Sequence, residues 1–331
     1  MIQVSHLTKR YGRRTAVEDL NFTVESGLVY GFLGPNSAGK STTMNILTGC
    51  LAPTEGQVTV GGFDIFDEPA KAKALVGYLP EQPPLYTGMT VREYLAFVAR
   101  AKGVKVDRLD EQLEHVIKVT GIAEVADRLI RNLSKGFKQR VGIAQALLGD
   151  PEVVILDEPT VGLDPLQIIE IRQLIRSLGK DHTVILSSHI LSEVQAVCDR
   201  ILMIHNGRLV ASGTPAELEG RFAGRVTYRL TVKAGSGPVR QALEKVDGVQ
   251  DIQTNDGADG RCDVTVTASD ASAAMDERLS FALSDKRIPV LRLEREQASL
   301  EDVFLVLTQG DDSSQIPAED KRRGRKGRKG E

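Results

Sequence analysis

Cysteine is scarce in this sequence of 331 residues, in which only Cys50, Cys198 and Cys262 occur. The three lie far apart in the chain and fit neither the paired spacing of a zinc site nor a disulfide framework. We therefore expect no structural zinc site and no disulfide-stabilised secreted domain. The cysteines themselves are expected to be reduced and buried.

Long apolar runs are absent as well. No stretch of 18 consecutive apolar residues occurs, whereas a membrane-spanning helix needs about 20. The first residues, from Met1 to His6, also lack the pattern of a signal peptide. We therefore expect a cytosolic protein that reaches a membrane only through a partner chain.

The sequence has no large net charge, because 42 lysines and arginines stand against 45 aspartates and glutamates. The charge is unevenly distributed, however, since residues 321–330 read KRRGRKGRKG and are almost wholly basic. We expect residues 309–331 to form a disordered, solvated tail. The alternatives are a tail attracted to anionic lipid head groups or to RNA.

A glycine-rich motif of the form G-x-x-x-x-G-K-[ST] is the densest signal in the chain. It consists of Gly34, Pro35, Asn36, Ser37, Ala38, Gly39, Lys40, Ser41 and Thr42. The apolar residues 28–33 before it predict a strand, and residues 43–48 after it predict a helix. In this context the motif indicates a phosphate-binding loop, whose backbone N–H groups and helix N-terminus hold an anion. We expect Lys40 to reach the β- and γ-phosphates and Ser41 to bind Mg²⁺.

Two adjacent carboxylates complement this loop. Residues 151–158 read PEVVILDE, a continuous apolar strand that ends in Asp157 and Glu158. Continuous apolarity is typical of a strand covered on both faces, as in a parallel sheet. We expect Asp157 to hold Mg²⁺ opposite Ser41, directly or through water. Glu158 is expected to orient or deprotonate an attacking water molecule.

A histidine ends a second apolar strand, which is predicted over residues 183–189. In doubly wound sheets, ligands lie at the carboxyl ends of the strands. A lone histidine is more often structural, but this position favours a place for His189 beside a γ-phosphate.

The chain divides into a larger and a smaller unit. Residues 1–220 are expected to form an α/β core, in which the alternating residues 3–7 and 16–24 predict an antiparallel β layer. A helical subdomain is expected within this core at about residues 85–150, where Thr90 begins a capping box.

The smaller unit is expected over residues 225–308. Its helices and strands follow one another in the order β-α-β-β-α-β, which is that of a ferredoxin-like α+β unit. Nothing in it indicates catalysis, so we expect a structural or partner-contact role.

Several motifs, in this order, resemble those of the nucleotide-binding subunit of ATP-binding cassette (ABC) transporters. They are the phosphate loop 34–42, LSKGF at 133–137, ILDEPT at 155–160, GLDP at 162–165 and SH at 188–189. The resemblance covers residues 1 to about 220 and implies a P-loop NTPase core of the ABC ATPase type. The smaller unit, which closes with SLEDVF, resembles the accessory domain of drug-export and gliding-motility ATPases in that family.

This resemblance implies an ATPase that works as a head-to-tail homodimer or heterodimer. Each ATP would lie between the phosphate loop of one subunit and the signature loop of the other. Ser134 and Gly136 would bind the γ-phosphate across the interface, in agreement with anion binding at a helix N-terminus. Asp164 would link the two sites. Tyr11, in a turn between two strands, matches the position that stacks on adenine.

The resemblance also implies a partner. The ATPase would power an ABC-2-type membrane permease supplied as a separate chain, from the inner face of the cell membrane. Its coupling surface would lie near residues 83–89. The likeness of the accessory domain points to export.

The sequence departs from the family pattern in the loops that would hold ATP. Ser37 stands where glycine is usual, so the phosphate loop is strained there if φ is positive. Lys135 and Phe137 replace the usual Gly and Gln of the signature. The metal-sensing Gln is expected where Glu81 stands, with Gln82 one place later, and either residue could take that role. The catalytic candidates Lys40, Glu158 and His189 are retained, so we expect a hydrolysing site.

Two other functions fit less of the sequence. A soluble ABC ATPase that acts on nucleic acid or the ribosome through the basic tail usually has two sets of motifs or a long coiled-coil insertion, whereas this chain has one set and no heptads. A phosphate-loop kinase or GTPase would leave residues 133–137 and His189 without a purpose.

Overall fold

The computed structural model describes residues 1–222, 226–257, 260–268, 273–296 and 300–309. Its larger unit is built on a six-stranded sheet with the order β10-β9-β3-β8-β7-β6. The strands are β3 (Val29–Leu33), β6 (Val76–Leu79), β7 (Val153–Asp157), β8 (Thr183–Ser188), β9 (Arg200–His205) and β10 (Arg208–Gly213). Neighbouring strands are parallel except in the β9–β10 hairpin. Because β3, β7 and β8 are buried along their whole length, the predicted covered parallel strands are confirmed.

An antiparallel sheet covers one face of the central sheet. It has the order β2-β1-β4-β5 and consists of β1 (Ile2–Tyr11), β2 (Arg14–Val24), β4 (Glu55–Val60) and β5 (Phe63–Asp64). Its inner residues share a core with helix α1 (Lys40–Leu47) and with the near face of the central sheet. Within this core the rings of Phe22 and Phe32 lie 5.9 Å apart. The predicted antiparallel layer is therefore confirmed.

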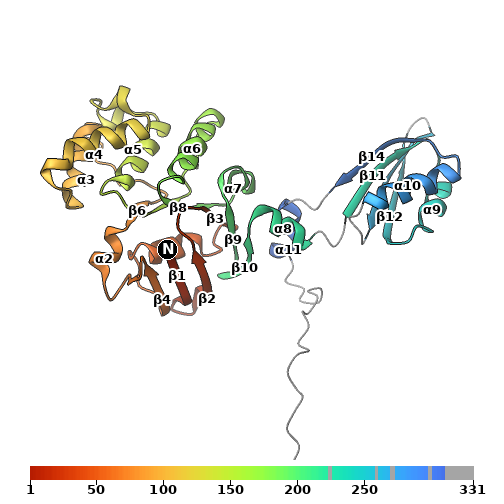
Figure 1. Cartoon of the computed structure of the whole chain (residues 1–331), viewed down its shortest axis with the longest axis horizontal. Helices are drawn as coiled ribbons and strands as arrows, with labels where there is room; N and C mark the ends of the chain where they lie inside the picture. The colour runs from red at the N-terminus through yellow and green to blue at the C-terminus, as the bar shows by residue number, and fades with distance from the viewer. Residues whose placement is uncertain (223–225, 258–259, 269–272, 297–299, 310–331) are drawn as a thin grey trace, which may run out of the picture.

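Helices cover the other face and extend beyond it (Figure 1). They are α3 (Val91–Ala101), α4 (Val106–Val119) and α5 (Lys135–Leu147) of the helical subdomain, and α6 (Pro165–Leu178) and α7 (Leu191–Val197) beside the sheet. The short helix α2 (Pro69–Ala74) and two 3₁₀ turns complete the connections. The capping box predicted at Thr90 is present: its hydroxyl accepts from Glu93 N, and the Glu93 carboxylate accepts from Thr90 N.

The smaller unit has its own sheet and core. It contains β11 (Val226–Val232), α9 (Ser236–Leu243), β12 (Val249–Asp256), β13 (Cys262–Ala268), α10 (Ala273–Asp285) and β14 (Val290–Glu296). The strand order β12-β13-β11-β14 is that of a ferredoxin-like sheet, as the element order predicts. Side chains of α9 and α10 fill the core on one face of this sheet.

The last described helix, α11 (Leu300–Gln309), returns to the larger unit. It packs against α8 (Pro215–Phe222) and β9, and Leu300 and Val303 join Leu218 in the core of the larger unit. The predicted boundaries place this segment in the smaller unit, because its sequence shows an apolar helix but not what covers it. In the sequence the smaller unit therefore comes between α8 and α11, and these two helices lie side by side (Figure 1).

Three further predictions concern single features of the chain. Cys198 and Cys262 are buried as expected, but Cys50 is exposed, because it follows α1 in a surface turn. Within the described ranges, no helix is long and apolar enough to cross a membrane. Gln309 is the last described residue, so the predicted basic tail that follows it lies outside the described part of the chain.

Candidate active site

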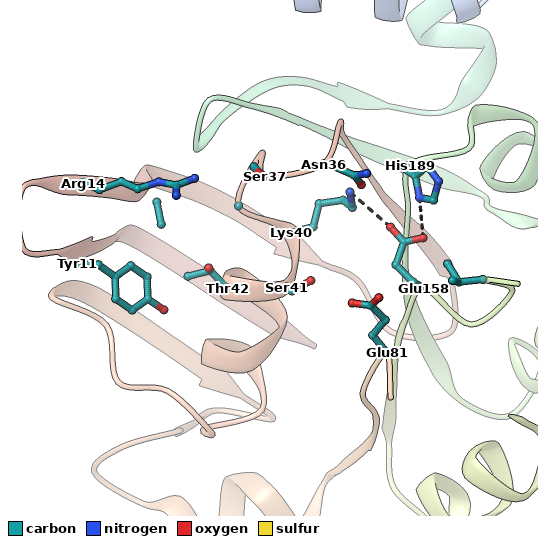
Figure 2. A pocket seen from close by; sticks show the side chains of 13 residues that line it. Tyr11, Arg14, Asn36, Ser37, Lys40, Ser41, Thr42, Glu81, Glu158 and His189 are labelled. Carbon is teal, nitrogen blue, oxygen red and sulfur yellow. Dashed lines mark hydrogen bonds and ion pairs between the residues drawn. The ribbon is translucent and has the colours of Figure 1, made fainter. Parts of the chain in front are cut away.

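A hollow of about 630 Å³ opens at the carboxyl ends of β3, β7 and β8. Figure 2 shows the side chains that line it. They come from the phosphate loop, from the β1–β2 turn and from the residues that follow β6, β7 and β8: Tyr11, Arg14, Ala16, Asn36, Ser37, Gly39, Lys40, Ser41, Thr42, Glu81, Glu158, Val161 and His189. Residues from five separate segments therefore meet at the edge of the sheet where the sequence places a ligand.

The phosphate loop connects β3 to α1, as predicted. Gly39 caps α1 with φ 108°, a conformation that side chains rarely adopt. A Cβ at Gly34 would lie 2.4 Å from the carbonyl oxygen of Ile204, so only glycine fits there. The loop therefore packs closely against β9, and residues of the loop and of the first turn of α1 line the hollow.

Ser37 adopts a left-handed backbone conformation, which is the condition under which we predict strain at this position, where glycine is usual. Its φ is 67°, and a residue other than glycine in this region costs about 1–2 kcal/mol. The strain lies in the loop itself, at a residue that lines the hollow. Backbone strain of this kind persists only where the surrounding structure over-determines it.

Replacing Ser37 with Gly is expected to relieve this strain, and replacing it with Val to increase it. Glycine also has more conformational freedom in the unfolded chain, and this offsets part of the relief. We therefore expect Ser37→Gly to raise the free energy of unfolding by at most about 1 kcal/mol. Ser37→Val should lower it by about 1–2 kcal/mol. Urea unfolding measures both values, with Ser192→Val as control, at an exposed position of helix α7. Equal effects of Val at the two positions would contradict the strain at Ser37.

Lys40 is the buried cation of the site. Its Nζ donates to the carbonyl oxygens of Gly34, at 2.8 Å, and Pro35, at 3.2 Å. It also lies 3.4 Å from Glu158 Oε1, and the lysine side chain is 6% exposed. The ammonium is thus held inside the loop, where its charge acts at short range on an anion.

Glu158 lies between Lys40 and His189 (Figure 2). Its Oε2 is 2.9 Å from His189 Nδ1, and the His189 side chain is 38% exposed toward the hollow. The backbone of Glu158 has φ 48° and donates its N–H to Ser187 Oγ at 3.0 Å. This left-handed turn directs the carboxylate back over the phosphate loop rather than along the strand.

Asp157 lies beneath the wall of the hollow and is 2% exposed. It accepts a hydrogen bond from Ser187 Oγ, so Ser187 orients both predicted carboxylate residues. Burial is the main cause that raises the pKa of the Tyr78 hydroxyl above its usual range, and the negative charge of Asp157 is the second cause. Tyr78 therefore stays neutral beside the carboxylate.

Of the two candidates for the metal-sensing position, Glu81 lines the hollow and Gln82 does not. The chain turns after β6 so that Glu81 faces the side of the hollow where Ser41 and Glu158 lie (Figure 2). The geometry therefore favours Glu81 over Gln82 for the metal-sensing role, and this assignment remains a proposal.

The three residues predicted to act across a dimer interface lie away from the hollow. Ser134 caps α5 and accepts a hydrogen bond from Phe137 N, and Asp164 caps α6 and accepts one from Gln167 N. Gly136 is buried against the side chain of Gln167. None of the three is among the residues that line the hollow of the described chain, so a single subunit does not bring the signature loop to its own phosphate loop.

The sequence did not single out Arg14, Ala16 and Val161, which also line the hollow. Arg14 belongs to the start of β2 and lies at the same end of the hollow as Tyr11 (Figure 2). The only signal for it was its place three residues after Tyr11. The Tyr11 side chain is 50% exposed, and Lys9 Nζ lies over its ring at 5.3 Å from the centroid.

Comparisons with known proteins agree with this geometry. A family model described as ABC transporter matches residues 17–161. The linearmycin resistance ATP-binding protein LnrL of Bacillus subtilis is 34% identical over 313 residues, which cover 93% of this chain and 98% of that protein. The bacitracin transport ATP-binding protein BcrA of Bacillus licheniformis is 35% identical over 313 residues, with coverages of 94% and 98%.

Solved structures show the same fold. The structure of an ATP binding subunit of an ABC transporter gives a TM-score of 0.61 and 32% identity, over 67% of this chain and 93% of that chain. A dimeric ATP-binding cassette in a post-hydrolysis state, bound to ADP and Pi, gives 0.59 and 25% identity, over 65% and 98%. The expected fold class and family are confirmed, and a nucleic-acid ATPase is not favoured. The chain belongs to the ABC transporter family, as an ATP-binding subunit that hydrolyses ATP.

Proposed function

We propose that this chain forms a head-to-tail dimer with two shared ATP sites, and that the dimer powers a separate ABC-2-type permease in export. The observation that carries the proposal is the Glu158 carboxylate, held between Lys40 and His189 above the phosphate loop. This arrangement supports ATP hydrolysis with the residues that the sequence predicted, in the roles that it gave them.

A dimer would complete the site. The N-terminus of α5 lies outside the hollow of its own chain, and Ser134 is exposed there, so this helix end would bind the γ-phosphate of a partner. Gly136, which is buried against Gln167, would act through its place in the first turn of the same helix. Exposed apolar side chains follow Glu158 and His189: Val161, Leu166, Ile169 and Ile190. Apolar residues at this edge fit burial against a second subunit. In the dimer, Asp164 would link the two sites.

Within each site the residues would divide the chemistry. Lys40 would hold the β- and γ-phosphates, and Tyr11 would stack on the adenine while Arg14 adds a second cation at that end. Glu158 would orient the attacking water and accept its proton. His189, hydrogen-bonded to Glu158, would contact the γ-phosphate and fix the direction of the carboxylate.

Mg²⁺ fits the donors that surround the phosphate loop. The Ser41 hydroxyl and the carboxylates of Asp157 and Glu81 are the hard oxygen ligands that this ion prefers, with water and phosphate oxygens completing its shell. Ser41 and Glu81 line the hollow, and Asp157 lies beneath it, so Asp157 would act through water. When bound, Mg²⁺ neutralises charge on the phosphate oxygens.

An aromatic cluster marks the surface proposed for the permease. Tyr86 and Phe97 are 53% and 44% exposed, and the Tyr86 ring packs on Phe97 at 5.4 Å and on Tyr94 at 6.0 Å. Tyr86 lies five residues after Glu81, so this surface is joined to the ATP site by a short segment. Exposed aromatics beside such a segment fit a docked partner.

The names of two relatives support export as the direction of transport. LnrL is named for linearmycin resistance and BcrA for bacitracin transport, and both align over nearly the whole chain, including the smaller unit. This likeness over nearly the whole of each chain supports export, from the cytoplasmic face of the cell membrane.

The permease is tested by purification from detergent-solubilised membranes of the native host. We expect a multi-spanning membrane protein to co-purify with the full chain in about equal amounts. Tyr86→Ser with Phe97→Ser should lower the recovered permease at least about tenfold, since aromatic anchors dominate interface energies. The ATPase rate of the isolated subunit should not change.

The matched control is Val106→Ser, an 86% exposed apolar residue at the start of α4. It should leave co-purification intact. Equal recovery of the permease with the aromatic double variant would contradict the proposed docking surface. Absence of any membrane protein from the wild-type complex would contradict the transporter role itself.

A further inference from the structure

Glu193 is a buried acidic residue that the chemistry above does not use. It lies in α7, which begins two residues after His189, and it is 4% exposed. A carboxylate is costly to bury unless polar groups compensate it. Its partners therefore indicate what it does.

Two hydroxyl groups are its close partners. Thr160 Oγ1 donates to Glu193 Oε2 at 2.6 Å, and Ser188 Oγ donates to the same oxygen at 3.0 Å. The nearest cation is more distant, because Arg172 Nη2 lies 3.9 Å from Glu193 Oε1. Within the described part of the chain, Arg172 Nε is buried without a hydrogen-bond partner. The carboxylate is thus held mainly by hydroxyls.

These hydroxyls lie beside the two residues proposed for catalysis. Thr160 follows Glu158 by two residues, and Ser188 directly precedes His189. Both are buried, at 5% and 0% exposure. The two segments leave different strands, β7 and β8, yet one carboxylate oxygen binds both. Glu193 therefore fixes the spacing of the segments whose side chains meet at 2.9 Å between Glu158 and His189.

We propose that Glu193 is a positioning residue for the Glu158–His189 pair, which it holds in place through the hydroxyls of Thr160 and Ser188. The inference rests on the proposed function of that pair. Glu193 itself does not line the hollow, so it contributes alignment and no contact with ATP. Proton transfer depends on hydrogen-bond geometry at the base, and a small displacement of either segment changes that geometry.

The test is Glu193→Gln in the full chain. A neutral amide accepts hydrogen bonds more weakly than a carboxylate, and its nitrogen cannot accept from a hydroxyl at all, so the hydrogen bonds from Thr160 and Ser188 are weakened or lost. We expect kcat to fall about tenfold while KM and the Kd of a fluorescent ATP analogue stay within about twofold. Thr160→Val and Ser188→Ala should each lower kcat by a smaller factor. Adding Thr160→Val to Glu193→Gln should cost little more than Glu193→Gln alone.

A further combination separates alignment from stability. If Glu193 acts through Glu158, adding Glu193→Gln to Glu158→Gln leaves the residual rate unchanged, whereas a general loss of folded protein would lower it further. The matched control is Gln195→Ala on the same helix, which contacts Glu219 instead and should leave kcat unchanged.

Unchanged kcat in folded Glu193→Gln would overturn the proposal, as would a proportional rise of KM and Kd. A further loss of the residual rate when Glu193→Gln is added to Glu158→Gln would overturn it too. If Glu193→Gln does not fold, Thr160→Val decides alone, by loss of kcat at constant Kd or by no loss. If the wild-type chain has no ATPase activity, the function proposed for the catalytic pair is contradicted. If the wild-type chain is active, the results for the variants bear on Glu193 only.

Discussion

Replacing Glu158 with Gln is expected to abolish ATP turnover while ATP binding persists. The amide keeps the size of the side chain and its contact with His189, but it cannot accept a proton from water. General base catalysis is worth about 10²- to 10⁴-fold, so we expect kcat to fall at least about a hundredfold. Phosphate release measures turnover, and a fluorescent ATP analogue measures affinity, which should stay within a few-fold.

The same variant tests the dimer. Because hydrolysis no longer separates the subunits, Glu158→Gln should elute as a dimer with ATP and as a monomer without it. Glu152→Gln is the matched control, since Glu152 is an exposed carboxylate at the start of the same strand segment and should leave turnover unchanged. Continued hydrolysis by Glu158→Gln would show that another group is the base.

Much of this site could be predicted because its parts are local patterns. The phosphate loop, the carboxylate pair and His189 each follow an apolar strand in the sequence. That Glu158 and His189 touch could not be predicted locally, since it depends on β7 and β8 being neighbours. The observed register pairs Asp157 with Ser187, which brings Glu158, one residue after Asp157, and His189, two residues after Ser187, to the same sheet edge.

The residues that were missed have no pattern of their own. Ser187 and Glu193 are ordinary polar residues in the sequence, and only their burial and partners reveal their roles. The left-handed backbone of Glu158 was also missed, because a glutamate gives no sign of positive φ, whereas Ser37 was found from the glycine expected in its place. Similarly, α11 was predicted as a helix, but its return to the larger unit depends on packing with α8.

Replacing Lys40 with Ala is expected to weaken ATP binding about a hundredfold or more, with an unchanged fold. The ammonium is a short-range partner for the phosphates, and charge-assisted hydrogen bonds are roughly twice as strong as neutral ones. Titration with a fluorescent ATP analogue measures the loss. Lys138→Ala, on helix α5, is the control and should bind normally. Normal affinity of Lys40→Ala would contradict the role of Lys40 in phosphate binding.

The ion pair between Lys40 and Glu158 gives a second reason to expect weaker ATP binding in Lys40→Ala. Lys40 Nζ lies 3.4 Å from Glu158 Oε1, and both side chains are less than a tenth exposed, at 6% and 9%. Removing Lys40 therefore leaves a buried carboxylate that repels the incoming phosphates. If so, adding Glu158→Gln to Lys40→Ala should restore about tenfold of the lost affinity. If the double variant binds as weakly as Lys40→Ala, Lys40 acts by direct phosphate contact alone. A recovery would show that the lysine also neutralises the catalytic base, so that one cation both binds the substrate and allows a carboxylate to stand beside it.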